Sequence, residues 1–374
     1  MATQTNKELH NALTLGSRVS ASSGPEPPVG SLKTFRKIGA GACGAIFSQD
    51  GDENPVVIKL AKSSDHTELW NDYQMHAAIV HEFCRRDTTD VRVPECYFFV
   101  PSDRASFWDK RPELLDAAKD VCHLPTAGLY TQRIRPLPAA TRELLIDKFC
   151  APMVKDKARA DPANRDCLVR VYLGSTQGKT PCGMFFSLRN FKLHLNHMTE
   201  LELDTEALAR RMGTALAVMH WGAKTDARDV EFVLGSSAEK RVAVDPVSVS
   251  VPVQDLEPFP YTGPPTDDDE NFFCRTTELF VLDFNQVRTI TMDDEGVAMA
   301  VEAWRLNDPY FPKPLRETEA EAERGVWEAF LSSYLDASDE IMGRPCDGLS
   351  LAMKFILGIT EVERNRRMMS RGAE

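Results

Sequence analysis

Hydrophobic positions in the first third of the chain follow the period of β-strands. Residues 35–47 alternate apolar and small side chains around glycines, which predicts two antiparallel strands joined by a tight loop. Short apolar runs predict three further strands at 56–60, 93–100 and 128–134. Residues 67–85 instead repeat apolar side chains near helical spacing, so a helix is expected after the third strand.

Further along the chain the period changes to that of α-helices. Residues 204–220 repeat apolar side chains on one stripe, and Asp204 stands where it can cap the N-terminus of the helix. Helices are also expected at 326–335 and 349–369. A strand-rich part followed by a mainly helical part predicts an α+β fold.

Changes in composition predict where the lobes begin and end. Residues 1–30 are polar and close in a Ser-, Gly- and Pro-rich stretch, so we expect a flexible N-terminal tail. Residues 31–135 hold the predicted strands and form the expected N-lobe, while 136–374 form a mainly helical C-lobe. Pro-rich residues 236–275 interrupt this C-lobe and are expected to be an exposed insertion.

A glycine-rich loop followed by a lysine indicates a phosphate-binding cleft. The loop between the first two expected strands contains Gly39, Gly41 and Gly44. Glycines let the backbone approach phosphate groups because no Cβ obstructs it. Lys59 follows on an apolar strand, where a lone ammonium is costly unless it is paired, and Glu68 and Asp72 on the next helix are the nearest carboxylates. The alternatives are an ordinary tight turn and a lysine that extends into solvent.

Two downstream phrases resemble the catalytic loop and the metal-binding Asp-Phe-Gly motif of protein kinases. They are residues 220–231 and 281–285, and an asparagine replaces the glycine of the second motif. Asp226 occupies the position of the catalytic base, and Asp283 that of the principal magnesium ligand. Their order after the glycine loop and Lys59 predicts a bilobal protein-kinase-like fold.

The departures from the kinase pattern fall on catalytic positions. Glu231 stands where kinases carry a metal-binding asparagine, and Asp229 adds a further carboxylate. With Asp226 and Asp283 this makes a group of carboxylates that cannot all ionise comfortably without a nearby cation. This cation could be Mg²⁺, a bound guanidinium or the neighbouring Arg228. The alternative to a functional site is a structural loop held by salt bridges.

Composition narrows the class of protein. The chain has 374 residues with 43% hydrophobic, enough for a large core, and its formal net charge is −12. The negative charge argues against general nucleic-acid binding, so no DNA partner is expected. We expect neither a membrane span nor a secretory leader, because the sequence has no apolar run of about 18 residues. Nine cysteines without a paired ligand spacing predict reduced thiols in the cytoplasm and no metal site.

Two basic groups stand against this acidic background. The first is in the segment 133–170 and the second at the end of the last expected helix. The candidate RNA-contacting residues in them are Lys155, Lys157, Arg159, Arg364, Arg366 and Arg367. Such runs can follow a phosphate backbone, although most of them are simply solvated faces.

Several phrases together resemble fungal proteins that carry the domain of unknown function 3669. They are residues 226–235 with the phrase Asp-Ala-Arg-Asp-Val-Glu, residues 281–286, the Leu-Trp-Asn-Asp-Tyr of 69–73 and the Ile-Arg-Pro-Leu-Pro of 134–138. The resemblance spans most of the chain, and the phrases are distinctive in combination. Within that group the chain is similar to the arginine-containing cyclodipeptide synthases of fungal secondary metabolism.

This resemblance implies an aminoacyltransferase that condenses an arginyl unit with a second amino acid into a diketopiperazine. The implied partners are arginyl-tRNA and a second charged tRNA, without ATP or Mg²⁺ as a cofactor because aminoacyl esters are already activated. The glycine loop with Gly39, Gly41 and Gly44 would then bind the terminal adenosine of the tRNA, and Lys59 is expected to be catalytic together with Asp226 and Asp283. Asp229 and Glu231 are expected to hold the guanidinium by bidentate hydrogen bonds, and Asp226 or Asp283 to assist proton transfer.

Two other classes of protein remain open. One is a small-molecule phosphotransferase that uses ATP and Mg²⁺, with Lys59 on the phosphates, Asp226 as base and Asp283 on the metal. Its weak points are Glu231 and the absent glycine after Phe284. The other is a kinase-like binding module without turnover.

Overall fold

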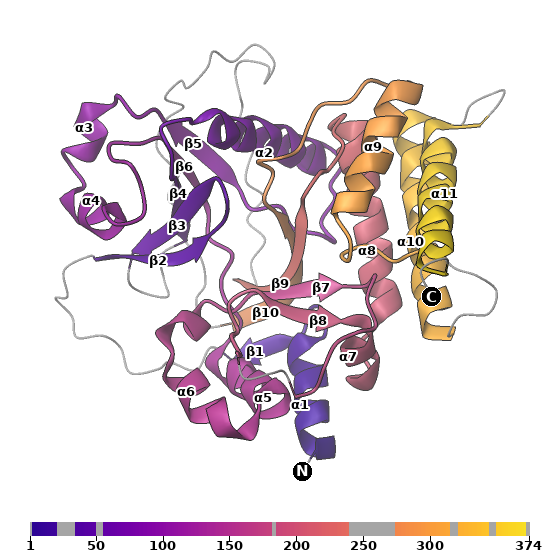
Figure 1. The fold of residues 1–374 in the computed structure, drawn as a ribbon, viewed down its shortest axis with the longest axis horizontal. Helices are drawn as coiled ribbons and strands as arrows, with labels where there is room; N and C mark the ends of the chain where they lie inside the picture. Colours follow the sequence, from indigo (N-terminus) through magenta and orange to yellow (C-terminus); the bar gives the residue numbers. More distant parts are fainter. Residues whose placement is uncertain are drawn as a thin grey trace.

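The computed structural model of the protein describes residues 2–20, 34–49, 55–181, 185–238, 274–314, 321–343 and 349–371. Two five-stranded sheets, each with its own helices, lie side by side, as Figure 1 shows. The N-terminal part is rich in strands and the C-terminal part is largely helical, which confirms the predicted α+β class with two lobes. None of the described helices is both long enough and apolar enough to cross a membrane.

The first sheet forms the N-lobe, and its strands pair in the order β2-β3-β4-β6-β5. The strands are β2 (Phe35–Ala40), β3 (Gly44–Gln49), β4 (Val56–Ala61), β6 (Gly128–Gln132) and β5 (Cys96–Val100). Every pairing is antiparallel. The predicted strands are therefore confirmed, although β5 begins three residues later than expected.

Helices cover both faces of this sheet. On one face α2 (Thr67–Arg85) packs against Phe99 and Leu129. On the other face two short helices, α3 (Ala105–Trp108) and α4 (Pro112–Ala118), pack against Phe98 and Tyr130. Successive strand side chains point to opposite faces, which is why neighbouring Phe98 and Phe99 belong to different apolar clusters.

A second sheet lies in the C-lobe, with the strand order β1-β10-β9-β7-β8. The strands are β1 (Arg18–Ser20), β10 (Cys274–Leu282), β9 (Glu231–Ala238), β7 (Val169–Tyr172) and β8 (Phe191–His194). The strands β9 and β10 carry the two ends of the predicted insertion 236–275, whose remaining residues 239–273 lie outside the described residues. At the other end of the pair, β9 begins at Glu231 and β10 ends one residue before Asp283, so both strands border the predicted site.

The predicted flexible tail over residues 1–30 is wrong for its first part. Residues 2–13 form the helix α1 (Ala2–Leu13), which packs against α5 (Ala139–Phe149), and β1 pairs with β10. Leu9 and Leu13 are buried because they lie four residues apart on one face of a helix. A polar sequence with only this narrow apolar face forms a helix when a neighbour covers it. Residues 21–30 lie outside the described residues.

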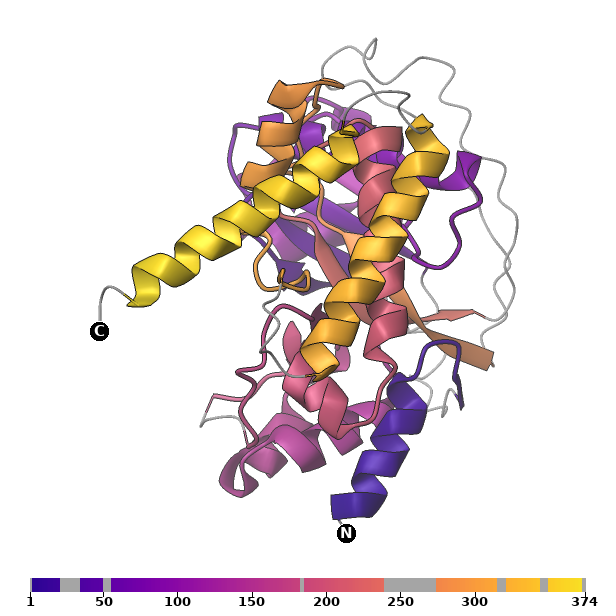
Figure 2. The same cartoon turned by 90° about the vertical axis from the view of Figure 1, so that its right-hand side faces the viewer.

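Helices form the rest of the C-lobe. The short ones are η1 (Pro152–Val154), α6 (Lys155–Ala160), η2 (Pro162–Arg165) and α7 (Leu195–Glu200). The longer ones are α8 (Thr205–Ala217), α9 (Asp294–Leu306), α10 (Glu321–Met342) and α11 (Leu351–Arg371). In Figure 2, α10 runs along α8, and α11 starts beside their upper ends and runs across α9 to the C-terminus at the left. The predicted cap is confirmed, since Asp204 accepts the backbone N–H of Ala207 at 2.8 Å.

The helix α8 continues into a single π-helical turn, Val218–Gly222, at the start of the predicted catalytic loop. His220 is buried there and its Nδ1 lies 3.0 Å from the Tyr334 hydroxyl of α10. Burial lowers the pKa of His220 to about 3, so this histidine is neutral. It therefore ties the loop to the helical core and takes no part in acid–base chemistry.

Candidate functional site

The predicted site forms around Lys59, between the two sheets. Its Nζ lies 2.7 Å from Asp72 Oδ2 on α2 and 2.9 Å from Asp283 Oδ1 at the end of β10. The lysine side chain is only 12% exposed. Burial alone would lower the pKa of Lys59, but the charges of Asp72 and Asp283 outweigh it and raise the pKa well above its usual range. Of the two helix carboxylates considered, Asp72 is the partner of the lysine and Glu68 is not.

The glycine loop packs directly against this lysine. A Cβ added to Gly44 would lie 2.9 Å from Lys59 Cγ, so a larger residue there would displace the lysine. The Gly41 N–H donates to the carbonyl of Gly44 at 2.9 Å and closes the hairpin. Gly39 lies at a register shift between β2 and β3, where a Cβ would lie 3.4 Å from Ile46 Cδ1. Gly44 is therefore the member of the motif that shapes the site.

Asp72 fixes the position of Asp283. One of its oxygens binds Lys59, and the other accepts the backbone N–H of Phe284 at 3.2 Å. Asp283 has a left-handed backbone with φ of 67°, which is uncommon for a residue other than glycine. Phe284 is fully buried and its ring centroid lies 4.8 Å from that of His76. The buried phenylalanine and the Asp72 hydrogen bond together hold the Asp283 carboxylate toward the lysine.

Asp229 stands on a second strained turn beside Asp283. Its φ is 61°, and its backbone N–H donates to Asn307 Oδ1 at 2.6 Å. Its Oδ2 accepts from Gln286 Nε2 at 2.7 Å. Burial and the nearby charge of Asp283 raise the pKa of Asp229. Asn307 and Gln286 were not predicted from the sequence, because nothing in their local pattern distinguishes them from surface amides.

Glu231 binds a cation that belongs to the protein itself. Its Oε1 lies 2.6 Å from Arg170 Nη2, an arginine on β7 that was predicted only as part of the basic segment. Burial raises the pKa of Glu231 to about 7, Arg170 offsets part of the rise, and the charges of Asp283 and Asp229 add to it. Of the two carboxylates predicted to hold a guanidinium, Glu231 thus already contacts one, whereas Asp229 contacts only an amide side chain.

Asp226 is separate from this group. Its side chain is fully buried, and its Oδ2 accepts from Arg288 Nε at 2.6 Å. Its Oδ1 accepts the backbone N–H groups of Arg228 and Arg288 at 3.1 and 2.9 Å. Because the carboxylate is fully buried and already accepts three hydrogen bonds from the protein, a substrate has no access to it, which argues against its predicted role as general base. Arg288 was not predicted, because it follows the aspartate by more than sixty positions.

The two basic groups are largely neutralised by acids of their own surroundings. Lys155 pairs with Asp147 at 3.4 Å, and Arg159 pairs with Asp147 at 2.6 Å. Lys157 is exposed and forms no ion pair within the part of the chain that the structure describes. On α11, Arg364 pairs with Glu361, Arg366 with Asp308, and Arg367 with Glu363. RNA contact by these residues stays a prediction.

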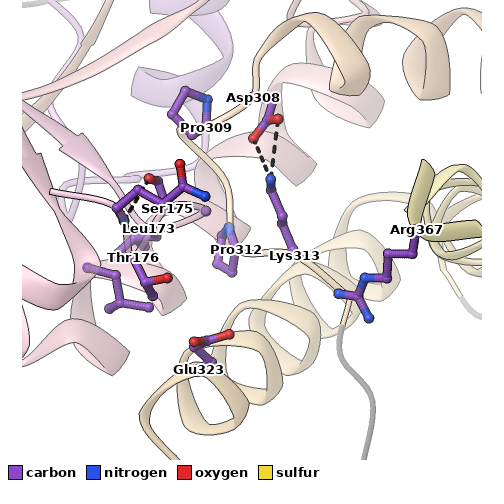
Figure 3. A pocket seen from close by; sticks show the side chains of 12 residues that line it. Leu173, Ser175, Thr176, Asp308, Pro309, Pro312, Lys313, Glu323 and Arg367 are labelled. Atoms are coloured by element: carbon purple, nitrogen blue, oxygen red, sulfur yellow. Dashed lines mark hydrogen bonds and ion pairs between the residues drawn. The ribbon is translucent and has the colours of Figure 1, made fainter. Parts of the chain in front are cut away.

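Pockets lie on two sides of the C-lobe. Figure 3 shows one of about 390 Å³, lined by the end of β7, the loop after α9, Glu323 of α10 and Arg367 of α11. Its Lys313 pairs with Asp308 at 3.1 Å, so the charges inside are partly compensated. A second pocket of about 660 Å³ lies between α2 and residues 285–289. This second pocket is the one that adjoins the carboxylates.

A metal centre has no obvious ligand set in the described parts of the chain. No group of three or more His, Cys, Asp and Glu side chains among those residues is arranged to hold a metal ion. Asp229, Glu231 and Asp283 instead share the site with Lys59 and Arg170, and these cations balance part of the negative charge.

Comparison with known proteins gives one match. Residues 279–345 match the family model described as DUF3669, zinc finger protein. No curated protein and no solved structure matches the chain. The matched segment runs from the end of β10 through α9 and α10, and its sequence contains neither cysteine nor histidine, the usual protein ligands of structural zinc. The similarity to the DUF3669 family is therefore shown for residues 279–345, which include Asp283.

Proposed function

We propose that this protein is a tRNA-dependent, arginine-specific cyclodipeptide synthase. In this reaction the α-amine of one aminoacyl unit attacks the ester carbonyl of the other, a peptide bond forms, and the 3′-oxygen of one tRNA leaves as its hydroxyl. The second α-amine then attacks the remaining ester, closes the six-membered ring and releases the second tRNA. Both steps use esters that are already activated, so they need neither ATP nor an oxidant. The cytoplasm, where charged tRNA is made, is the compartment that this reaction requires.

The observation that carries the proposal is the contrast of Asp226 and Glu231 with Asp229 and Asp283. Asp226, the base of the phosphotransfer scheme, is buried against Arg288. Glu231, in the place of the second metal ligand, binds Arg170. The residues of a phosphotransferase are thus occupied by internal arginines, while an acidic group remains around Asp229 and Asp283. A group of this kind suits a cationic substrate.

Asp229 and Asp283 are the proposed guanidinium ligands. Within the described residues the Asp229 side chain accepts one hydrogen bond, from Gln286 on Oδ2, and its Oδ1 is the oxygen proposed to bind the ligand. The side chain of Asp283 is 29% exposed and uses one oxygen for Lys59. A planar guanidinium has five N–H donors, so it can bridge two such carboxylates.

Glu231 is the proposed general base. A base is most effective when its pKa lies near the working pH, and the pKa of Glu231 is about 7. The α-ammonium group of an amino acid has a pKa of about 8. Glu231 can therefore accept a proton from the α-ammonium group before the amine attacks. Arg170 stabilises the Glu231 carboxylate once Glu231 has released this proton. The sequence had suggested Asp226 or Asp283 for this role.

A phosphotransferase is the second candidate, favoured by one observation. Lys59 bridges a helix carboxylate and Asp283 under a glycine-rich hairpin, which is the arrangement that positions nucleotide phosphates. In this scheme ATP and Mg²⁺ would bind over Lys59 and Asp283.

The test is incubation of the purified full chain with total tRNA, aminoacyl-tRNA synthetases, ATP and all amino acids, with labelled arginine. The expected result is a labelled cyclic dipeptide in the mass spectrum that disappears after RNase treatment. Preformed arginyl-tRNA and a second charged tRNA should give the same product without ATP. Product that survives RNase but needs ATP would favour the phosphotransferase, and binding of tRNA without any product would favour a non-catalytic module.

A further inference from the structure

The pocket between α2 and residues 285–289 has a rigid frame. One stripe of α2 forms a wall with Glu68, Asn71, Met75 and Ala78, which lie three and four residues apart on one helix face. Asn71 Nδ2 donates to the carbonyls of Asn285 and Val287, each at 2.9 Å, and so joins the helix to the opposite wall. Its volume of about 660 Å³ is within the range of about 300–1,000 Å³ that is typical of small-molecule sites.

The lining of this pocket offers little charge. Glu68 and Arg288 are the ionisable residues among the described residues that line it. The Arg288 guanidinium is already bound to Asp226 at 2.6 Å and to Glu302 at 2.9 Å, and Glu68 is exposed in the first turn of α2. The rest of the surface consists of methionine, alanine, valine, amide and hydroxyl groups. A charged side chain placed along Gln74 and Ala78, beyond Glu68, would lose its hydration at a higher free-energy cost than an uncharged one.

One residue joins this pocket to the acidic group. Gln286 lines the pocket, and its Nε2 donates to Asp229 Oδ2 at 2.7 Å. The segment 285–289 that forms the wall also begins two residues after Asp283. A molecule in the pocket therefore lies next to the carboxylates proposed to hold the guanidinium.

From this geometry we infer that the pocket receives the side chain of the second aminoacyl unit, and that this unit is an uncharged amino acid. The inference rests on the proposed function, because it assigns the partner of the arginyl unit in that reaction. The acidic group around Asp229 binds the guanidinium of the arginyl unit, and the pocket beside it binds the side chain of the second aminoacyl unit. The half-buried Ala78 and Ala223 offer an apolar surface to the body of this side chain, while Gln74 offers a hydrogen bond to a polar tip.

The test uses the full chain with the charging mixture and compares product identities between variants. Ala78→Leu adds volume inside the pocket, and Ala140→Leu makes the same change at an exposed position of α5 as the matched control. Gln74→Leu keeps the size of the lining residue but removes its amide. All variants are first checked by thermal melting, and the ratio of cyclic Arg–X products is then measured by mass spectrometry.

We expect Ala78→Leu to lower products with branched or aromatic X at least about tenfold relative to products with glycine or alanine. A change of one methylene in an apolar pocket typically alters discrimination by roughly 10–200-fold. Gln74→Leu should shift X from polar toward apolar side chains. If Ala78→Leu does not fold, the product ratios of Gln74→Leu alone test the pocket assignment. Ala140→Leu should leave the ratios unchanged.

Two results would count against different claims. A wild-type chain that makes no arginine-containing product overturns the proposed function itself. A wild-type chain that makes the product, with unchanged ratios of X in Ala78→Leu and Gln74→Leu, overturns the pocket assignment and leaves the function standing. A uniform loss of all products with unchanged ratios also overturns it, because a specificity pocket must change the choice of X.

Discussion

Two glutamates on neighbouring strands, each paired with an arginine, are expected to change the stability of the protein with pH in opposite directions. Glu231 on β9 pairs with Arg170 at 2.6 Å, and Glu278 on β10 pairs with Arg92 at 2.6 Å. Burial raises the pKa of Glu231 to about 7, with Asp283 and Asp229 adding to the rise. Burial also acts on Glu278, but the hydrogen bond and charge of Arg92 outweigh it and lower the pKa. Since the ion-pair distances are equal, the arginine alone does not set the sign of the shift. Burial with the charges of Asp283 and Asp229 prevails at Glu231, whereas the hydrogen bonds and charge of Arg92 prevail at Glu278.

The sign for Glu231 follows from proton linkage. Its pKa rises from 4.5 in the unfolded chain to about 7 in the folded one, so the folded state holds the proton in that window. The stabilisation is fully present below pH 4.5 and is lost as the pH rises through about 7. At about 1.4 kcal/mol for each pH unit, a pKa rise from 4.5 to about 7 changes the free energy of unfolding by at most about 3.5 kcal/mol. For Glu278 the stabilisation is present above pH 4.5 and is lost as the pH falls through its lowered pKa.

The assay is urea unfolding of the wild type, Glu231→Gln and Glu278→Gln at pH 5, 6, 7 and 8. Glutamine keeps an oxygen for the arginine but cannot titrate. The free energy of unfolding of the wild type relative to Glu231→Gln should fall by up to about 3 kcal/mol from pH 5 to pH 8. Relative to Glu278→Gln it should stay nearly constant from pH 5 to pH 8, because this window lies above the unfolded pKa of 4.5. Parallel pH curves for the wild type and Glu231→Gln would refute the reasoning, because they would mean that Glu231 is ionised throughout.

Three further predictions concern single side chains. Asp226→Asn should lower the free energy of unfolding in urea by about 2–3 kcal/mol, since its amide would face the Arg288 donor. A variant with wild-type stability that makes no product would instead indicate that Asp226 has a catalytic role. Asp229→Asn should reduce cyclic product at least about 100-fold in the charging assay, because removing one partner of a desolvated charge pair costs about 2–5 kcal/mol of binding free energy. Near-normal activity would contradict the assignment of Asp229 as a guanidinium ligand. Lys157→Glu should weaken tRNA binding and reduce its salt slope by about one without changing the melting temperature; an unchanged slope would exclude this face.

Local patterns were sufficient wherever neighbouring residues decide the outcome. The alternation around the glycines predicted the β2–β3 hairpin, and helical spacing predicted α2 and α8, because side-chain period depends only on the backbone conformation. The cap at Asp204 was predictable for the same reason, since its partner Ala207 lies three residues away. The motifs that carry Lys59 and Asp283 were also visible, and the fold brings these two residues to 2.9 Å.

Partners from distant segments were decided only by the tertiary structure. Arg288 reaches Asp226, Arg170 reaches Glu231, and Asn307 holds the backbone of Asp229, although none of these pairs is close in the sequence. Such contacts depend on how sheets and helices pack. The sequence does not show whether a charged residue faces solvent or pairs with a buried residue of opposite charge. The helix α1 is stabilised in the same way, by its packing on α5. The sequence alone thus determined which carboxylates are present near the site, whereas the packing of distant arginines determined which of them remain available to a substrate.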